Sequence, residues 1–336
     1  MSRTRGQVLP GKSGAAWLLG LVLLAGSSGV LLGPAGFSPA ELWRALMPGA
    51  EPSTARSILL SLRLPRTVGA LATGASLAVS GALFQALLRN PLAEPYLLGV
   101  SSGAALGAVA AITLGLGSLG PAFLTLASLA GAILAVGVVF RVASVVGKLD
   151  TRVLILAGVV VASFFGACVM LLLTFAEGEA LRSAVLWTMG SLAGASWGTD
   201  LALLAYALPA SAIAFGMSRD LNALALGEEA AAHLGTDVER AKRRAYFLAS
   251  ALAAAAVAVA GVVGFVGLVV PHTVRLLWGA DHRLVLPLSF LGGAALLGLA
   301  DTAARTVASP LEVPIGVITA LVGVPFFLFL LRRSSV

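Results

Sequence analysis

The sequence predicts an all-α membrane protein with ten transmembrane helices. Three observations support this: 59% of the 336 residues are hydrophobic, only 11% are charged, and the mean hydropathy is +0.99. A soluble domain carries about 25% charged residues, so this chain lacks the charge to cover a water-facing surface of its size. The net charge of +7 comes from basic residues between apolar stretches, a pattern that indicates membrane topology and argues against nucleic acid as a partner.

Apolar stretches of about 20 residues, long enough to cross a bilayer, follow one another along the chain. We expect spans at 15–33, from Ser61 to between Gln85 and Asn90, and at 97–115, 119–140, 153–175, 198–217, 245–271, 284–303 and 314–331. Residues 1–14 form a basic tail, and residues 15–333 form a single transmembrane domain. A signal peptide is disfavoured because the first apolar run is long and lacks a clear cleavage site.

The run 245–271 is too long for one upright helix and short for two. Gly261, Gly264 and Gly267 lie in its middle, where the chain can reverse. Two shortened helices give ten spans with both termini in the cytoplasm, and one helix gives nine. The ten-span arrangement places most of the 22 Lys and Arg residues on the cytoplasmic side and is therefore favoured.

The chain is not expected to be an enzyme or to bind nucleotide. Residues Gly6 to Ser13 match the phosphate-loop pattern, but that loop needs a preceding strand, and only five residues precede it. Nearly all acidic residues lie in loops, whereas an ion-coupled carrier keeps ionisable residues inside its helices. A partner ATPase is therefore the favoured energy source. An ion-coupled carrier and a non-transporting scaffold are the alternatives.

The polar segment 218–244 is the candidate partner interface. Leu221 and Leu224 fall at helical spacing, as do Ala231 and Leu234. Two short amphipathic helices of this kind can press into a groove on another protein. They can equally lie on the lipid surface, and the spacing leaves both possibilities open.

Several blocks carry a family resemblance. They are Arg63-Leu-Pro-Arg66, Gly81–Gly99, Leu224–Gly235, Gly264–Arg275, Asp281–Arg283, Ala300–Arg305 and Glu312–Gly316. In this order they resemble the vitamin B12 and iron–siderophore permeases, the FecCD family. The resemblance implies the type II ABC importer permease fold, with ten helices per subunit and paired short helices at 245–271.

The same resemblance implies the setting of the protein. We expect a multi-pass protein of the bacterial plasma (inner) membrane that works as a homodimer with two cytoplasmic ATP-binding subunits and an extracytoplasmic substrate-binding protein. A ferric siderophore is ranked first as substrate because it is the commonest cargo of the family. Haem and cobalamin are the alternatives.

Three arginines are candidates for docking the binding protein. Arg63 and Arg66 lie three residues apart on one helical face, and a guanidinium can fork a carboxylate with two hydrogen bonds. The resemblance implies this role for both and for Arg305. The alternatives are arginines that snorkel to the interface and, for Arg305, an intrahelical pair with Asp301 four residues earlier.

The resemblance also assigns two cytoplasmic sites. The ATPase-coupling residues are Leu221, Leu224, Leu226, Gly227, Glu228, Ala231, Leu234 and Gly235. The gate residues are Asn90, Leu92 and Thr151, although the acidic neighbour Asp150 departs from the small hydroxyl residue expected there. No cofactor and no metal are expected, because His233, His272 and His282 lack metal-ligand spacing.

Overall fold

The computed structural model describes residues 11–47, 52–116, 120–145 and 147–334, and most of them are helical. The long helices are α1 (Gly11–Leu31), α4 (Leu64–Leu87), α6 (Pro121–Ala143), α7 (Thr151–Phe175), α9 (Trp197–Gly216), α12 (Val238–Ala260), α14 (His282–Thr306) and α15 (Ile315–Ser334). The shorter ones are α2 (Pro39–Leu46), α3 (Thr54–Ile58), α5 (Val100–Thr113), α8 (Gly178–Thr188), α10 (Ser218–Ala225), α11 (Glu228–His233) and α13 (Val266–Trp278). A π-helical turn (Leu59–Arg63) joins α3 to α4, a 3-10 turn (Pro95–Leu98) precedes α5, and strands β1 (Ser144–Val145) and β2 (Lys148–Leu149) form a small hairpin.

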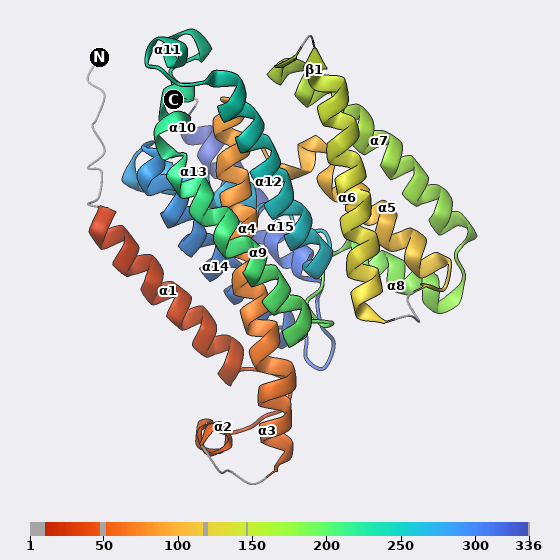
Figure 1. The fold of residues 1–336 in the computed structure, drawn as a ribbon. Helices are drawn as coiled ribbons and strands as arrows, with labels where there is room; N and C mark the ends of the chain where they lie inside the picture. Colours follow the sequence, from red (N-terminus) through yellow and green to blue (C-terminus); the bar gives the residue numbers. More distant parts are fainter. Residues whose placement is uncertain (1–10, 48–51, 117–119, 146, 335–336) are drawn as a thin grey trace.

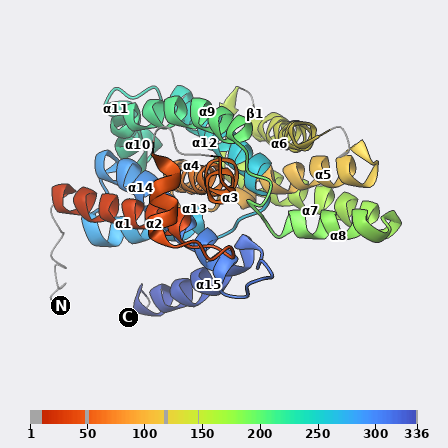
Figure 2. The ribbon, with the colours of Figure 1, turned by 90° about the horizontal axis from the view of Figure 1, so that it is seen from below.

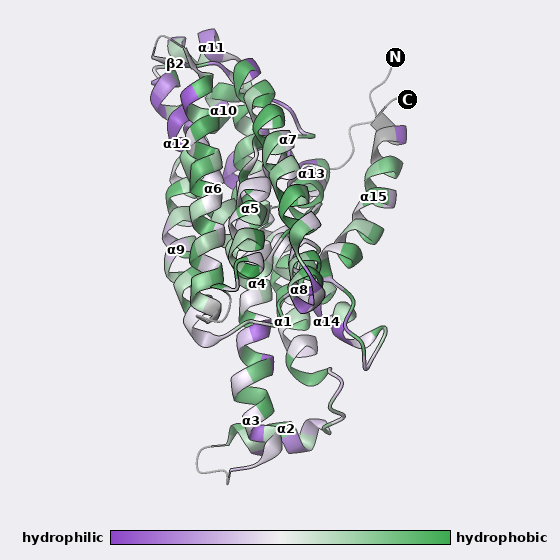
Figure 3. Cartoon of the chain, turned by 90° about the vertical axis from the view of Figure 1, so that its right-hand side faces the viewer, coloured by the Kyte–Doolittle hydropathy of each residue, from purple (hydrophilic) through white to green (hydrophobic). Residues whose placement is uncertain are grey.

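The all-α membrane fold is confirmed. Among the described residues, seven helical stretches are long and apolar enough to cross a membrane, and α5, α13 and the apolar part of α15 are shorter. The count of ten spans therefore stays a prediction. Figure 3 shows hydrophobic residues along the length of the bundle and hydrophilic residues gathered at its two ends.

Helix α4 occupies the centre of the bundle, and α9, α12, α13 and α14 pack around it (Figure 1). Helices α5, α6, α7 and α8 form a second group beside this centre, and α15 lies at the margin (Figure 2). One end of the bundle carries α2 and α3, and we call it the α2 end. The opposite end carries α10, α11 and the hairpin, and we call it the α11 end.

The structure confirms that the run 245–271 is broken, but its helices begin and end elsewhere than expected. Helix α12 already starts at Val238 because the side chain of Asp237 accepts a hydrogen bond from the backbone N–H of Arg240 and caps it. It ends at Ala260, and the next residue, Gly261, has a φ of 68° that favours glycine. Of the three glycines expected in the turn, Gly267 lies inside α13.

The tail 1–14 is described only in part. Residues 1–10, which include most of the phosphate-loop match, lie outside the described residues. Gly11 to Ser13 form the first turn of α1.

Helix α4 meets its neighbours backbone to backbone. A Cβ atom placed on Gly81 would lie within van der Waals overlap of the carbonyl oxygen of Gly267 on α13. This approach is the close packing that small residues allow between membrane helices, where hydrophobic burial contributes little to association.

We therefore expect Gly81→Ala to lower the free energy of unfolding by roughly 2 kcal/mol, because α4 and α13 must separate to admit the methyl group. The control is Gly137→Ala on α6, where a Cβ meets no atom within 4 Å. Thermal unfolding of the purified protein in detergent measures both. Equal midpoints for the two variants would contradict the close approach.

Candidate functional site

Two arginines and two acids form an ionic cluster at the α2 end. Arg66 Nε lies 2.9 Å from Asp301 Oδ1, and Arg66 Nη1 lies 2.9 Å from Glu312 Oε1. Arg305 Nε lies 3.0 Å from Asp301 Oδ2. Asp301 is therefore shared by two guanidinium groups, and only 1% of its side chain is exposed. We call Arg66, Asp301, Arg305 and Glu312, with Arg63, the arginine cluster.

Arg63 is held by backbone rather than by an acid. Its guanidinium donates to the carbonyl oxygens of Val30 at 3.0 Å, Leu31 at 3.1 Å and Ala35 at 2.5 Å, where α1 ends. The ring of Phe37 lies 5.7 Å from its Cζ atom, within the range of a cation–π contact. Carbonyl groups at a helix C-terminus lack helical partners, so Arg63 completes the end of α1.

Of the roles considered for Arg305, the intrahelical pair with Asp301 is present in the structure. The arginine pairs with Asp301 and also donates to the carbonyl oxygen of Gly29 at 3.1 Å. Arg63 and Arg305 are each 4% exposed, so both are buried within the chain. Together with Arg66 and Glu312 they line a cavity of about 280 Å³ at the α2 end.

The coupling segment is a pair of short helices, α10 and α11, that caps the opposite end (Figure 1). The five Leu and Ala residues among the predicted coupling residues divide into two sets. Leu221, Leu224 and Ala231 are buried against the bundle. Leu226 and Leu234 are 68% and 59% exposed, and they present an apolar surface to the surroundings of the α11 end. The other coupling residues are half-buried at Gly227 and Glu228 and exposed at Gly235.

Helix α10 is tied to the start of α14 through one amide side chain. Asn222 Nδ2 donates to Asp281 Oδ1 at 2.7 Å, and its Oδ1 accepts from the backbone N–H of His282 at 2.9 Å. Asp281 also accepts from the backbone N–H of Arg283. These hydrogen bonds to Asn222 and Arg283 lower the pKa of Asp281.

The predicted gate residues lie near the same end, in the loop after α4 and at the start of α7. Asn90 follows α4, and its Oδ1 accepts from the backbone N–H of Leu92 at 2.9 Å. Thr151 is the first residue of α7, and Asp150 caps that helix by accepting from the N–H groups of Val153 and Arg152. These bonds lower the pKa of Asp150. The acidic neighbour that departs from the family pattern thus serves as a helix cap.

The sequence did not single out Lys242, which the structure places at the centre of a network below α11. The residue is 4% exposed, although it stands in a basic run that suggested a polar connector. Its helical spacing to Ala245, Tyr246 and Ala249, all buried on α12, was the available signal.

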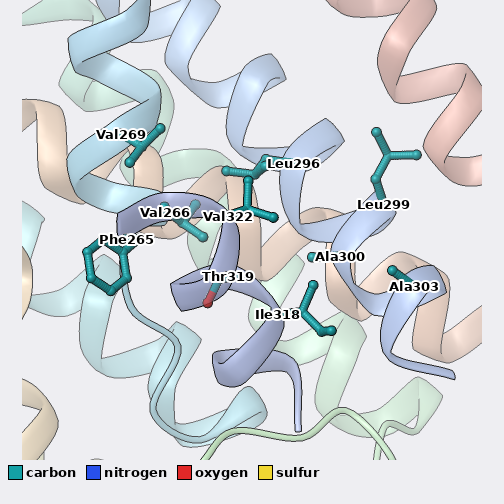
Figure 4. Close-up of a pocket in the computed structure, with 11 residues that line it drawn as sticks. Phe265, Val266, Val269, Leu296, Leu299, Ala300, Ala303, Ile318, Thr319 and Val322 are labelled. Atoms are coloured by element: carbon teal, nitrogen blue, oxygen red, sulfur yellow. The ribbon is translucent and has the colours of Figure 1, made fainter. Parts of the chain in front are cut away.

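A mainly apolar cavity of about 240 Å³ separates α15 from α13 and α14. Figure 4 shows Val266, Leu296, Ile318 and Val322 facing it from all three helices. Thr319 also lines it, and its hydroxyl donates to the carbonyl oxygen of Gly316 at 3.1 Å. Helix α15 is thus less tightly packed than the central helices.

Comparison with known sequences identifies the family, because the FecCD transport family matches residues 18–333. The chain belongs to the FecCD transport family. It is 47% identical over 289 residues to the cobalamin import system permease protein BtuC of Halobacterium salinarum, covering 85% of this chain and 76% of that one. It is 45% identical over 280 residues to the hemin transport system permease protein HmuU of Yersinia pestis, covering 82% and 84%.

Two further similarities cover almost the whole chain. The vitamin B12 import system permease protein BtuC of Salmonella typhi is 40% identical over 320 residues, which is 95% of each chain. A solved structure, described as an inward-facing conformation of a metal-chelate type ABC transporter, superimposes with a TM-score of 0.84 at 33% identity, covering 95% of this chain and 98% of that one. The chain is therefore an ABC importer permease, and the predicted family and fold class are confirmed.

Replacement of Asp301 by Asn should lower the free energy of unfolding by about 3 kcal/mol, because buried Arg305 and largely shielded Arg66 lose their shared anion. The matched control is Glu312→Gln, which removes the more exposed acid from the same arginine and should cost about 1 kcal/mol or less. Chemical denaturation in detergent measures both. Equal losses would show that Asp301 does not hold the cluster together.

Proposed function

We propose that this permease works as a homodimer, powered by two cytoplasmic ATP-binding subunits and fed by an extracytoplasmic binding protein. The proposal is supported by the position of two candidate partner sites at opposite ends of the bundle. The α11 end carries the coupling helices, and the α2 end carries the arginine cluster.

The charge distribution supports the orientation. Basic residues gather at the α11 end on the hairpin, at the start of α7, on α10 and at the start of α12, and include Lys148, Arg152, Arg219, Arg243 and Arg244. Segments rich in Lys and Arg favour the cytoplasmic side. We therefore assign the α11 end and both termini to the cytoplasm.

The ATPase contacts the exposed part of the coupling segment. Leu226 and Leu234 provide apolar anchors for a groove on the ATPase, and buried Leu221, Leu224 and Ala231 hold the two helices in place. Gly227 and Gly235, with φ values of 113° and 83°, allow the turns that end each helix. In the alternative interpretation the segment is a connector that lies on the lipid surface, and it makes no contact with an ATPase.

Charged replacements separate these readings. Leu226→Asp and Leu234→Asp should reduce co-purification of the ATPase at least tenfold, because a carboxylate would be buried without a partner in the interface. Leu226→Ala is the comparison variant, because it shortens one anchor without adding charge, and it should reduce co-purification less than Leu226→Asp does. ATPase retention by both Asp variants, in protein with wild-type thermal stability, would exclude this contact.

Docking of the binding protein is assigned to the α2 end. Arg66 is the most accessible of the three arginines, with 12% of its side chain exposed, and its partner Glu312 is 39% exposed. A carboxylate of the binding protein can replace Glu312 at Arg66 with two parallel hydrogen bonds. Arg63 and Arg305 act from within the chain by fixing the end of α1 and the position of Asp301.

The substrate is a bulky metal chelate, and we place a corrinoid first. Two of the relatives reported above are named for cobalamin or vitamin B12, and one of them matches 95% of this chain. Haem comes next because of the relative named for hemin. Family frequency alone favours a ferric siderophore, and none of these relatives is named for one.

The cognate binding protein tests both proposals. Titration with cobalamin, hemin and a ferric siderophore should give the tightest binding to cobalamin, and tightest binding to another chelate would change the assignment.

The loaded binding protein should then bind Arg66→Gln about tenfold more weakly than wild type, because one charge-assisted contact is lost. Arg44→Gln, on exposed α2, is the control, and equal affinities for the two variants would contradict docking through Arg66.

A further inference from the structure

Lys242 joins three segments that are separate in the sequence. Its Nζ atom lies 2.7 Å from the carbonyl oxygen of Leu149 in β2, 3.0 Å from Glu228 Oε2 in α11, and 2.7 Å from Glu239 Oε1 in α12. An ammonium group has three N–H donors, and these three oxygens can use all of them. The side chain is 4% exposed, so the contacts form in a site largely shielded from water.

The β2 strand is held from two directions. Glu239 Oε2 accepts from the backbone N–H of Leu149 at 2.8 Å, and Lys242 donates to the carbonyl oxygen of the same residue. The backbone N–H and C=O groups of Leu149 are therefore both bound by one ion pair on α12, Glu239 with Lys242. The guanidinium of Arg243 also donates to the carbonyl oxygen of Gly147 in the turn of the hairpin.

The hairpin leads directly into the gate. Ser144 pairs with Leu149 across its two strands, and the backbone N–H of Asp150 donates to the carbonyl oxygen of Ala143. Asp150 caps α7, and Thr151 is the first residue of that helix. A displacement of Leu149 therefore moves Thr151, since only Asp150 separates them.

Glu228 is the link from the coupling segment to this network. It is the first residue of α11, and its carboxylate is the group through which α11 reaches Lys242. Helix α11 has one buried side chain, Ala231, so the ion pair is a large part of its attachment to the bundle. The neighbouring Glu229 is exposed.

We propose that Lys242 is a positioning residue that transmits movement of α11 to the β1–β2 hairpin and so to Thr151. The proposal rests on the proposed function, because the movement is supplied by the ATPase. When the ATPase shifts α11, the Glu228–Lys242 pair carries the shift to α12 and β2 together. Without the pair, α11 moves and the gate does not follow.

Glu228→Gln is the cleanest test, because Lys242 keeps Glu239 and the Leu149 carbonyl and is not left unpaired. With the complex reconstituted in liposomes, the variant should consume at least about fivefold more ATP per transported substrate molecule, the lower end of the range for coupling between two sites. The ATPase should still co-purify, because the exposed anchors Leu226 and Leu234 are unchanged, and the loss of thermal stability should be small because Glu228 is 39% exposed. Glu229→Gln is the matched control and should behave as wild type in every assay.

A double-mutant cycle distinguishes transmission from simple structural support. Lys242→Met should uncouple transport at least as strongly as Glu228→Gln, and the double variant should be no worse than Lys242→Met alone, because both changes remove one interaction. Additive effects, or an ATP-to-substrate ratio unchanged in Glu228→Gln, would overturn the proposal. If wild-type protein itself shows no ATP-dependent transport with its ATPase, the proposed function fails instead.

Discussion

The backbone of α4 is in contact with its neighbours because most of the residues it buries are Gly, Ala, Ser or Thr. Its Gly81 meets Gly267 of α13, and its Gly74 meets Gly293 of α14 so closely that a Cβ atom on either would overlap a backbone carbonyl. In lipid, helices gain little from burying apolar surface, and close van der Waals packing takes that role. The positions of α13 and α14, and of the charged groups at their ends, follow from this packing.

Two networks of ion pairs, one centred on Asp301 and one on Lys242, lie near opposite ends of the bundle. At the α2 end, Asp301 holds Arg66 and Arg305. At the α11 end, Lys242 holds Glu228 and Glu239. In each network one buried ion binds a partner on its own helix and at least one on a distant segment, and a charge buried without such partners would be costly. Both networks therefore fix the positions of short or irregular segments that apolar packing alone cannot hold.

Composition and glycine placement predicted the helices well, since both reflect local chemistry. The break in 245–271 was found from its glycines, and Gly261 does end α12. The start of α12 was missed because its first turns carry charged residues, although Asp237 is a normal helix cap. Contacts such as Arg66 with Glu312, and Lys242 with Leu149, join residues far apart in the chain. No spacing rule reports them, and the family resemblance named the arginines without their partners.

Helix α14 reaches both ends, and this limits how the two sites can communicate. It begins at Asp281 and His282, which hold Asn222 of the coupling segment, and it ends with Asp301 and Arg305. Between them the helix is close-packed on α4. An apolar, densely packed middle cannot relay a signal through charges, and it resists deformation. We therefore expect any movement between the two ends to be a displacement of whole helices, with ionic contacts acting only where a helix joins a loop.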